Sequence, residues 1–188
     1  KSSRVEALVA VDHQYDLALV RLKGKLDVKP LPLGRSDQLS AGAPLAALAE
    51  VSGQIIITSG EMRGWLELIK DRVKLMAISM SLEKPTSGAP IFNNENEVAG
   101  LALVLESGIK FGVPVESLLA LTRSDRGLDL KSARKEIYFE TSEGSYLAGK
   151  AACLLNEPAA AIRYFEKYVK LKPDDGEAYL CLGRCYYQ

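Results

Sequence analysis

The chain has 188 residues, of which 47% are hydrophobic and 26% charged, as expected for a folded globular protein with one medium domain or two small ones. Its 24 Lys and Arg residues balance 24 Asp and Glu residues, so no overall charge attracts nucleic acid or an anionic membrane. No apolar run approaches the roughly 18–20 residues that span a bilayer, and no signal peptide is recognisable. The chain begins at Lys1, as a mature or trimmed form would, and its compartment stays open.

The first part of the chain, residues 4–122, predicts a β domain. Many short apolar runs separated by Gly and Asn residues favour a β-barrel or a sandwich. The six longest runs are 5–11, 16–22, 44–49, 54–60, 73–80 and 97–105. After Pro114, leucines at helical spacing over residues 115–122 predict a helix.

The last part of the chain predicts helices. Residues 123–142 are charged and mixed, which indicates a linker or a lead-in helix. From residue 143 onward the apolar spacing is helical. Pro158 suits the first turn of a helix, where its missing N–H has no partner, and Pro173 is expected to end that helix.

This helical tail, residues 143–188, also repeats. Gly149 and Gly183 are 34 residues apart, the period of a tetratricopeptide repeat (TPR). Matches to that repeat's pattern are Ala161, Phe165, Pro173, Tyr179, Leu182, Gly183 and Tyr186. Small residues at 148, 149, 152 and 161 would let two antiparallel helices approach closely, with Phe165 between them. The tail therefore resembles one TPR and the first helix of the next. About three repeats are usually needed for stability, so we expect it to pack on its neighbour or to have lost C-terminal sequence.

The three cysteines all lie in this tail, at Cys153, Cys181 and Cys185. An odd number without metal-type spacing predicts no disulfide framework. Cys181 and Cys185 are four apart in a helical pattern, so we expect them to be small buried apolar residues and not metal ligands. The glycines of residues 59–64 lack the spacing of a phosphate-binding loop. The sequence predicts no cofactor, no metal and no nucleic-acid partner.

Residues 5–122 resemble the trypsin-like peptidase fold, in its bacterial HtrA (Deg) branch. Five segments carry the resemblance in chain order: VAVDHQYDLALVRL (9–22), PLPLGRSDQLSAGAPLAAL (30–48), IIITSGEMRGW (55–65), PTSGAPIFNNENEVAGLAL (85–103) and GIKFGVPVESLLAL (108–121). In the third segment, the family has a strand and a turn that end in Thr-Ser-Gly. Such a peptidase has two six-stranded barrels with its site between them. Only about two first-barrel strands are present here, at residues 4–22, too few to bury a core alone.

The resemblance implies a multidomain chain, β then α. A trypsin-like antiparallel β-barrel with an incomplete first barrel is expected over residues 1–122. A linker or lead-in helix over residues 123–142 and TPR helical hairpins over residues 143–188 would follow. The rest of the first barrel is missing, supplied separately or replaced.

The resemblance also implies the site residues. Ser87 matches the nucleophile and Asp16 the carboxylate that orients a histidine. The loop that holds the oxyanion would comprise Pro85, Thr86, Ser87 and Gly88. The strand that pairs with substrate by β-augmentation would contain Leu101, Ala102, Leu103 and Val104.

Two parts of this machinery are lacking. The histidine of the family comes from well upstream, whereas His13 is three residues before Asp16 in a predicted turn, and nothing directs the amine of Lys84 to Ser87. Pro85 stands where the family has a glycine that donates an oxyanion-hole N–H, and proline has no N–H. In another protease, loss of one such donor costs about 10²–10³ in turnover. We therefore expect negligible peptidase activity from this chain.

Three functions stay open. The first is a serine endopeptidase whose histidine comes from an upstream half-barrel. The second is a pseudoprotease that binds a peptide in its cleft and recruits protein partners through its TPR helices. The third is a structural module with no ligand in the cleft. Fold alone does not decide among them.

Overall fold

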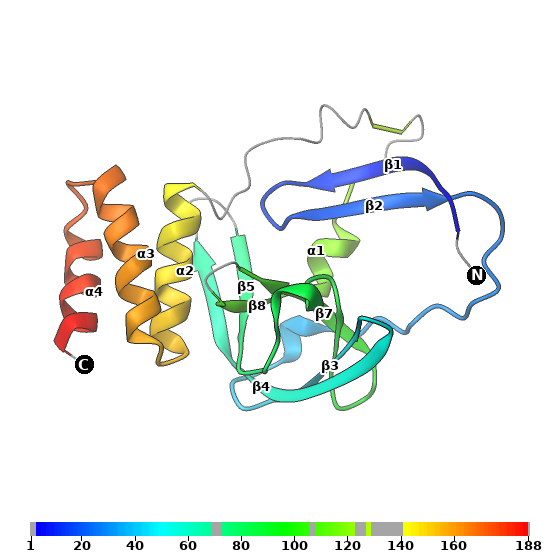
Figure 1. Ribbon diagram of the computed structural model, residues 1–188, viewed down its shortest axis with the longest axis horizontal. Coiled ribbons are helices and arrows are strands. Elements are labelled where there is room, and N and C mark those ends of the chain that lie inside the picture. The colour runs from blue at the N-terminus through cyan, green and yellow to red at the C-terminus, as the bar shows by residue number, and fades with distance from the viewer. Residues whose placement is uncertain (1–2, 69–72, 106–107, 123–126, 129–140, 188) are drawn as a thin grey trace.

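The computed structural model describes residues 3–68, 73–105, 108–122, 127–128 and 141–187. A β-barrel lies at the centre of the molecule, with three helices side by side at one end and a two-stranded ribbon across another face (Figure 1). The N-terminus lies beside the ribbon, and the C-terminus lies beside the last helix.

The barrel is closed and antiparallel, with the strand order β3-β4-β5-β8-β7-β6. Its strands are β3 (Pro44–Val51), β4 (Gln54–Leu68), β5 (Val73–Ile78), β6 (Pro90–Phe92), β7 (Val98–Val104) and β8 (Lys110–Pro114). Two short 3₁₀ turns lie at Ser36–Gln38 and Lys84–Thr86, and α1 (Val115–Leu119) follows β8. The prediction of an antiparallel β-barrel is thus confirmed, as is the helix after Pro114.

Strand β4 differs from the prediction, because the Thr-Ser-Gly segment is not a turn. The strand continues past Gly60 to Leu68. A Cβ atom on Gly60 would lie 2.1 Å from the carbonyl oxygen of Ser79, so glycine allows the strand to bend closely against the chain that follows β5. A β-bulge between Met62 and Gly64 bends it further, with Gly64 at φ 149°. The glycines therefore curve one long strand around the barrel.

The ribbon consists of β1 (Val5–Asp12) and β2 (Leu17–Leu22), paired antiparallel. Its turn is held by Asp12, whose Oδ1 accepts the backbone N–H groups of Gln14 at 2.8 Å and Tyr15 at 3.2 Å. The ribbon tip is attached to the barrel because the Tyr15 hydroxyl accepts the N–H of Lys74 at 3.0 Å. Leu17 is buried in the core beside it.

The helical tail contains α2 (Ser142–Leu154), α3 (Pro158–Leu171) and α4 (Gly176–Tyr187). Pro158 lies at the start of α3, as predicted, and Pro173 follows its end. The Thr141 side chain caps α2 by accepting the N–H of Gly144 at 3.1 Å.

Small residues do bring α2 and α3 together. Ala148, Ala152 and Ala161 have no exposed surface, and neither has Phe165. A Cβ atom on Gly149 would lie 2.8–3.0 Å from three atoms of the Phe165 ring. The predicted close approach of two helices around Phe165 is confirmed.

The tail shares a core with the barrel. One cluster of buried side chains includes Leu66, Leu75 and Phe111 from the barrel together with Leu147 and Phe165 from the helices. Packing of the tail on its neighbour, one of the two alternatives expected, is therefore observed. The predicted linker or lead-in helix, residues 123–142, lies largely outside the described residues.

Of the two cysteines expected to be buried, Cys185 is buried and Cys181 is half-buried, whereas Cys153 is exposed. Cys153 lies at the C-terminal end of α2, where the adjacent Leu154 is also 45% exposed. Over the ranges that the structure describes, no helix has the length and apolarity to cross a membrane.

Candidate functional site

A pocket of about 230 Å³ brings together the ribbon tip, the serine loop and the barrel. Its lining residues are Tyr15, Asp16, Leu17, Ser87, Gly88, Leu101, Ala102, Leu103 and Val113. Asp16 and Ser87, which are 71 positions apart in the sequence, thus line the same pocket, together with three of the four residues named as the substrate strand. Val104, Pro85 and Thr86 are not among the lining residues.

Asp16 reaches the pocket because of the ribbon's turn. Its φ of 52° is left-handed, a conformation that Asp tolerates better than most side chains. Tyr15 anchors the turn on β5 through its hydroxyl, and Leu17 packs into the core on the other side. Asp16, itself exposed, is therefore held at the pocket by its two neighbours.

The hydroxyl of Ser87 is bound to the end of β7. Its Oγ accepts the backbone N–H of Val104 at 3.0 Å and lies 3.4 Å from the carbonyl oxygen of Val104, to which it donates. For attack on a carbonyl, this oxygen needs a base that takes its proton. Among the described residues, the hydrogen-bond partners of this hydroxyl are the backbone N–H and carbonyl of Val104, and neither is a base.

The loop before Ser87 explains how Pro85 is accommodated. Residues Lys84–Thr86 form a 3₁₀ turn, whose backbone angles suit the fixed φ of proline. Thr86 closes this turn, since its N–H and hydroxyl both donate to the carbonyl of Glu83, at 2.8 and 2.6 Å. The local turn geometry is therefore compatible with a proline at position 85.

The backbone N–H groups on either side of Ser87 both donate to carbonyls of the protein. The Thr86 N–H donates to Glu83, and the Gly88 N–H donates to the carbonyl of Ala102 at 2.7 Å. An oxyanion hole needs donors that point at the developing charge. Both neighbouring donors are already bonded within the protein.

Strand β7 is paired on both sides along the substrate strand. Leu101 and Leu103 pair with Val113 and Phe111 of β8. On the opposite side, Ala102 donates to Ala89 at 2.8 Å and accepts from Gly88. Val104 is the residue at which the Ser87 side chain takes the place of a backbone partner. Peptide pairing along β7 would therefore begin at Val104 and would require the Ser87 hydroxyl to leave it.

Of the two residues considered as bases, His13 does not line the pocket. It lies in the turn between β1 and β2, as predicted, and is half-buried. The side chain of Lys84 lies outside what the structure describes. The pocket lining therefore contains a carboxylate and a hydroxyl but no imidazole.

Sequence reasoning missed Tyr15 and Val113. A tyrosine next to the candidate carboxylate, in a turn of otherwise polar residues, is a signal for an anchor, but its partner is a backbone N–H of a distant strand. Val113 was included only in the segment 108–121, and no role was predicted for it. Its position opposite Leu101 in the sheet register brings it to the pocket.

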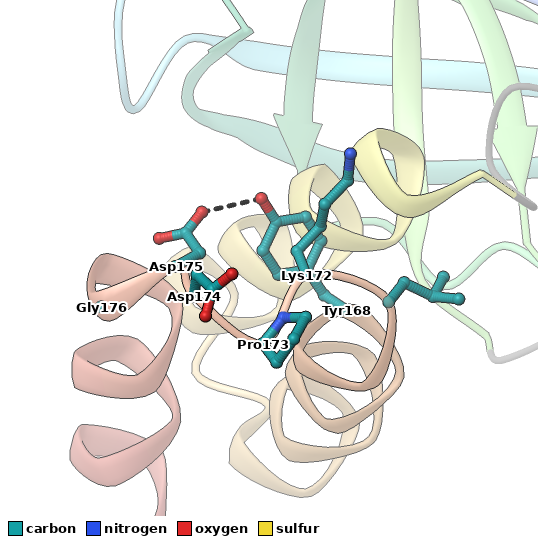
Figure 2. A pocket seen from close by; sticks show the side chains of 7 residues that line it. Tyr168, Lys172, Pro173, Asp174, Asp175 and Gly176 are labelled. Carbon is teal, nitrogen blue, oxygen red and sulfur yellow. Dashed lines mark hydrogen bonds between the residues drawn. The ribbon is translucent and has the colours of Figure 1, made fainter.

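A second hollow, of about 560 Å³, lies at the loop between α3 and α4 (Figure 2). The Tyr168 hydroxyl donates to Asp175 at 2.7 Å, and the other carboxylate oxygen of Asp175 accepts the Ala178 N–H at 3.1 Å. These bonds lower the pKa of Asp175, the tyrosine bond being the larger cause. Burial, followed by the bond to Asp175, raises the pKa of Tyr168 to about 12. Asp175 thus caps the N-terminus of α4. We interpret the hollow as a consequence of this loop's structure, not as a binding site.

Comparison with known proteins agrees with this geometry. The model of the trypsin-like peptidase domain matches residues 1–101. Serine protease HTR4 of Rattus norvegicus is 33% identical over 116 residues, covering 57% of this chain and 24% of that protein. The anti-sigma-I factor RsgI9 of Acetivibrio thermocellus is 25% identical over 166 residues, covering 83% of this chain and 23% of that protein.

The fold is similar to the structure of the HtrA-type protease AlgW with a decapeptide. The TM-score is 0.52 at 19% identity, covering 61% of this chain and 38% of that one. The chain spans about a quarter of the length of the curated relatives it matches. The family model matches more than half of the residues, so the chain belongs to the trypsin-like peptidase domain family.

Proposed function

We propose that this chain is the substrate-binding part of an HtrA-type serine endopeptidase with a TPR tail, and that residues 1–188 alone do not hydrolyse peptides. The observation that carries the proposal is the pocket shared by Asp16, Ser87 and β7. Peptide hydrolysis of this type uses a hydroxyl as nucleophile and a carboxylate that orients the base. Both groups line this pocket, beside β7. The imidazole is the missing component, because His13 lies outside the lining.

Labelling with a serine-directed fluorophosphonate tests this proposal. We expect Ser87 in residues 1–188 to stay unlabelled, because its hydroxyl is bound to Val104 and has no base. A longer natural form that contributes a histidine should be labelled at Ser87 and lose labelling on Ser87→Ala. Labelling of Ser87 in residues 1–188 would contradict the inactivity, and an unlabelled but folded longer form would contradict the endopeptidase assignment.

A second function, a peptide-binding pseudoprotease, is favoured by a different observation. The Thr86 and Gly88 N–H groups are bonded elsewhere, so Pro85 leaves the oxyanion hole one donor short even if a histidine is supplied. One relative, which matches over 83% of this chain, is named an anti-sigma factor, and that is not a protease name. In this function the cleft binds a peptide without cutting it, and the TPR helices recruit protein partners.

Binding of a fluorescent decapeptide rich in alanine and valine separates the two functions. A pseudoprotease should bind the peptide, release it intact and lose affinity on Leu103→Asp, which places a charge on the pocket lining. Leu48→Asp is the matched control, because Leu48 is 41% exposed on β3 and does not line the pocket. Pro85→Gly adds a further test. If a longer form with a histidine becomes labelled only with this substitution, the missing N–H is the limiting defect.

A further inference from the structure

Two thiols from different helices meet in the tail. Cys153, near the end of α2, and Cys185, near the end of α4, have their Sγ atoms 3.3 Å apart although 32 positions separate them in the sequence. Helix α3 lies entirely between them in the sequence. The contact therefore joins the first helix of the tail to the last.

The two thiols differ in accessibility in the way a thiol–disulfide exchange requires. Cys153 is an exposed residue although its thiol is partly buried, whereas Cys185 is only 4% exposed. A dissolved disulfide would therefore meet Cys153 first. Cys181 is half-buried one turn earlier on α4. The pKa of the Cys153 thiol is raised to about 12, mainly by burial and secondly by its hydrogen bond with Cys185. The Cys153 thiol is therefore protonated at neutral pH, and exchange is faster in mildly alkaline solution.

We propose that Cys153 and Cys185 are a disulfide-forming pair that joins α2 to α4 covalently, with a small-molecule disulfide such as oxidised glutathione as the oxidant. The Cys153 thiolate attacks one sulfur of glutathione disulfide and releases the first glutathione thiolate. The Cys185 thiolate then attacks the Cys153 sulfur of the mixed disulfide and releases the second. The two protons lost by the protein thiols end on the two glutathiones, so the protein is oxidised and the glutathione disulfide is reduced.

The geometry requires little rearrangement. A disulfide has an S–S length of about 2.0 Å, so the two sulfurs need to approach by about 1.3 Å from their present separation. The cross-link closes a loop that contains α3, which limits the freedom of the unfolded chain. It also fixes α4 on the α2–α3 pair whether or not the chain binds peptides, so the inference does not depend on the proposed function.

The experiment uses the folded, reduced chain in mildly alkaline buffer with an excess of oxidised glutathione, followed by alkylation and peptide mapping. We expect loss of two hydrogens, a Cys153–Cys185 linked peptide and an alkylated Cys181. The melting temperature of the oxidised form should exceed that of the reduced form by about 4–16 °C. Cys181→Ala is the matched control and should form the same link, whereas Cys153→Ser should not.

Three results would overturn the inference. These are a Cys153–Cys181 link in place of the expected one, a link that forms only in denaturant, and all three cysteines still alkylated after equilibration with the oxidant. Circular dichroism of each variant before oxidation verifies that the helices are folded, so a failure to link is not a failure to fold.

Discussion

Alanine substitution at two helical glycines, Gly149 and Gly183, should stabilise the protein only at Gly183. Both lie inside helices, α2 and α4, so each Gly→Ala change gains about 1 kcal/mol of helix propensity. At Gly183 a new Cβ meets nothing within 4 Å, so Gly183→Ala should stabilise the protein by about that amount. At Gly149 the new Cβ meets three ring atoms of Phe165 at 2.8–3.0 Å.

The Phe165 ring has no exposed surface and cannot turn outward. Overpacking of this kind costs about 1–3 kcal/mol, so Gly149→Ala should be neutral or destabilising by up to about 2 kcal/mol after the propensity gain. The two variants should thus differ by about 1–3 kcal/mol in the free energy of unfolding, or roughly 2–12 °C in melting temperature. Urea titration followed by circular dichroism measures the difference. Equal stabilisation by both substitutions would refute the close packing of α2 on α3.

Three further substitutions test contacts that hold the site and the tail. Tyr15→Phe removes the acceptor of the Lys74 N–H and should lower the free energy of unfolding by about 1 kcal/mol; an unchanged urea midpoint would show that the ribbon tip is not anchored there. Glu116→Ala removes the carboxylate that accepts the N–H groups of Ser36 and Asp37 and the Ser36 hydroxyl, and should cost roughly 1.5–3 kcal/mol by thermal unfolding, with Glu95→Ala as a surface control. The pKa of Asp175 is lowered in the folded chain, so its carboxylate stabilises the fold above its ordinary pKa, and that contribution is lost as pH falls below about 4. Asp175→Asn should therefore unfold at a lower temperature than the parent at neutral pH, and the gap should shrink in acid; a gap independent of pH would contradict this assignment.

Local patterns predicted most of the strands and helices, because the spacing of apolar residues within one segment indicates whether it forms a strand or a helix. The runs at 5–11 and 73–80 lie close to β1 and β5. The end of β4 was not predictable in this way. A glycine in a sequence indicates a turn, a bend or a close approach equally well, and the carbonyl of Ser79 that requires Gly60 belongs to another segment.

The candidate site shows the same division between local and distant information. Asp16 and Ser87 were identified from their segments, and their shared pocket depends on the pairing of the ribbon tip with β5. The bond from Val104 to Ser87 could not be predicted, since it joins a side chain to the backbone of a strand 17 positions away. The exposure of Cys153 could not be predicted either. Helical spacing does not show how far along α2 a neighbouring helix covers its side chains.

The core shared by barrel and helices has a mechanical consequence. Leu147 and Phe165 belong to the same buried cluster as Leu75 and Phe111, so the tail is not a flexible tether. A molecule bound to the outer face of α4 would be held at a fixed distance and angle from the pocket. A pulling force applied to α4 would be transmitted through α3 and α2 to the barrel. The tail would then act as a rigid arm that sets where a captured molecule meets the pocket.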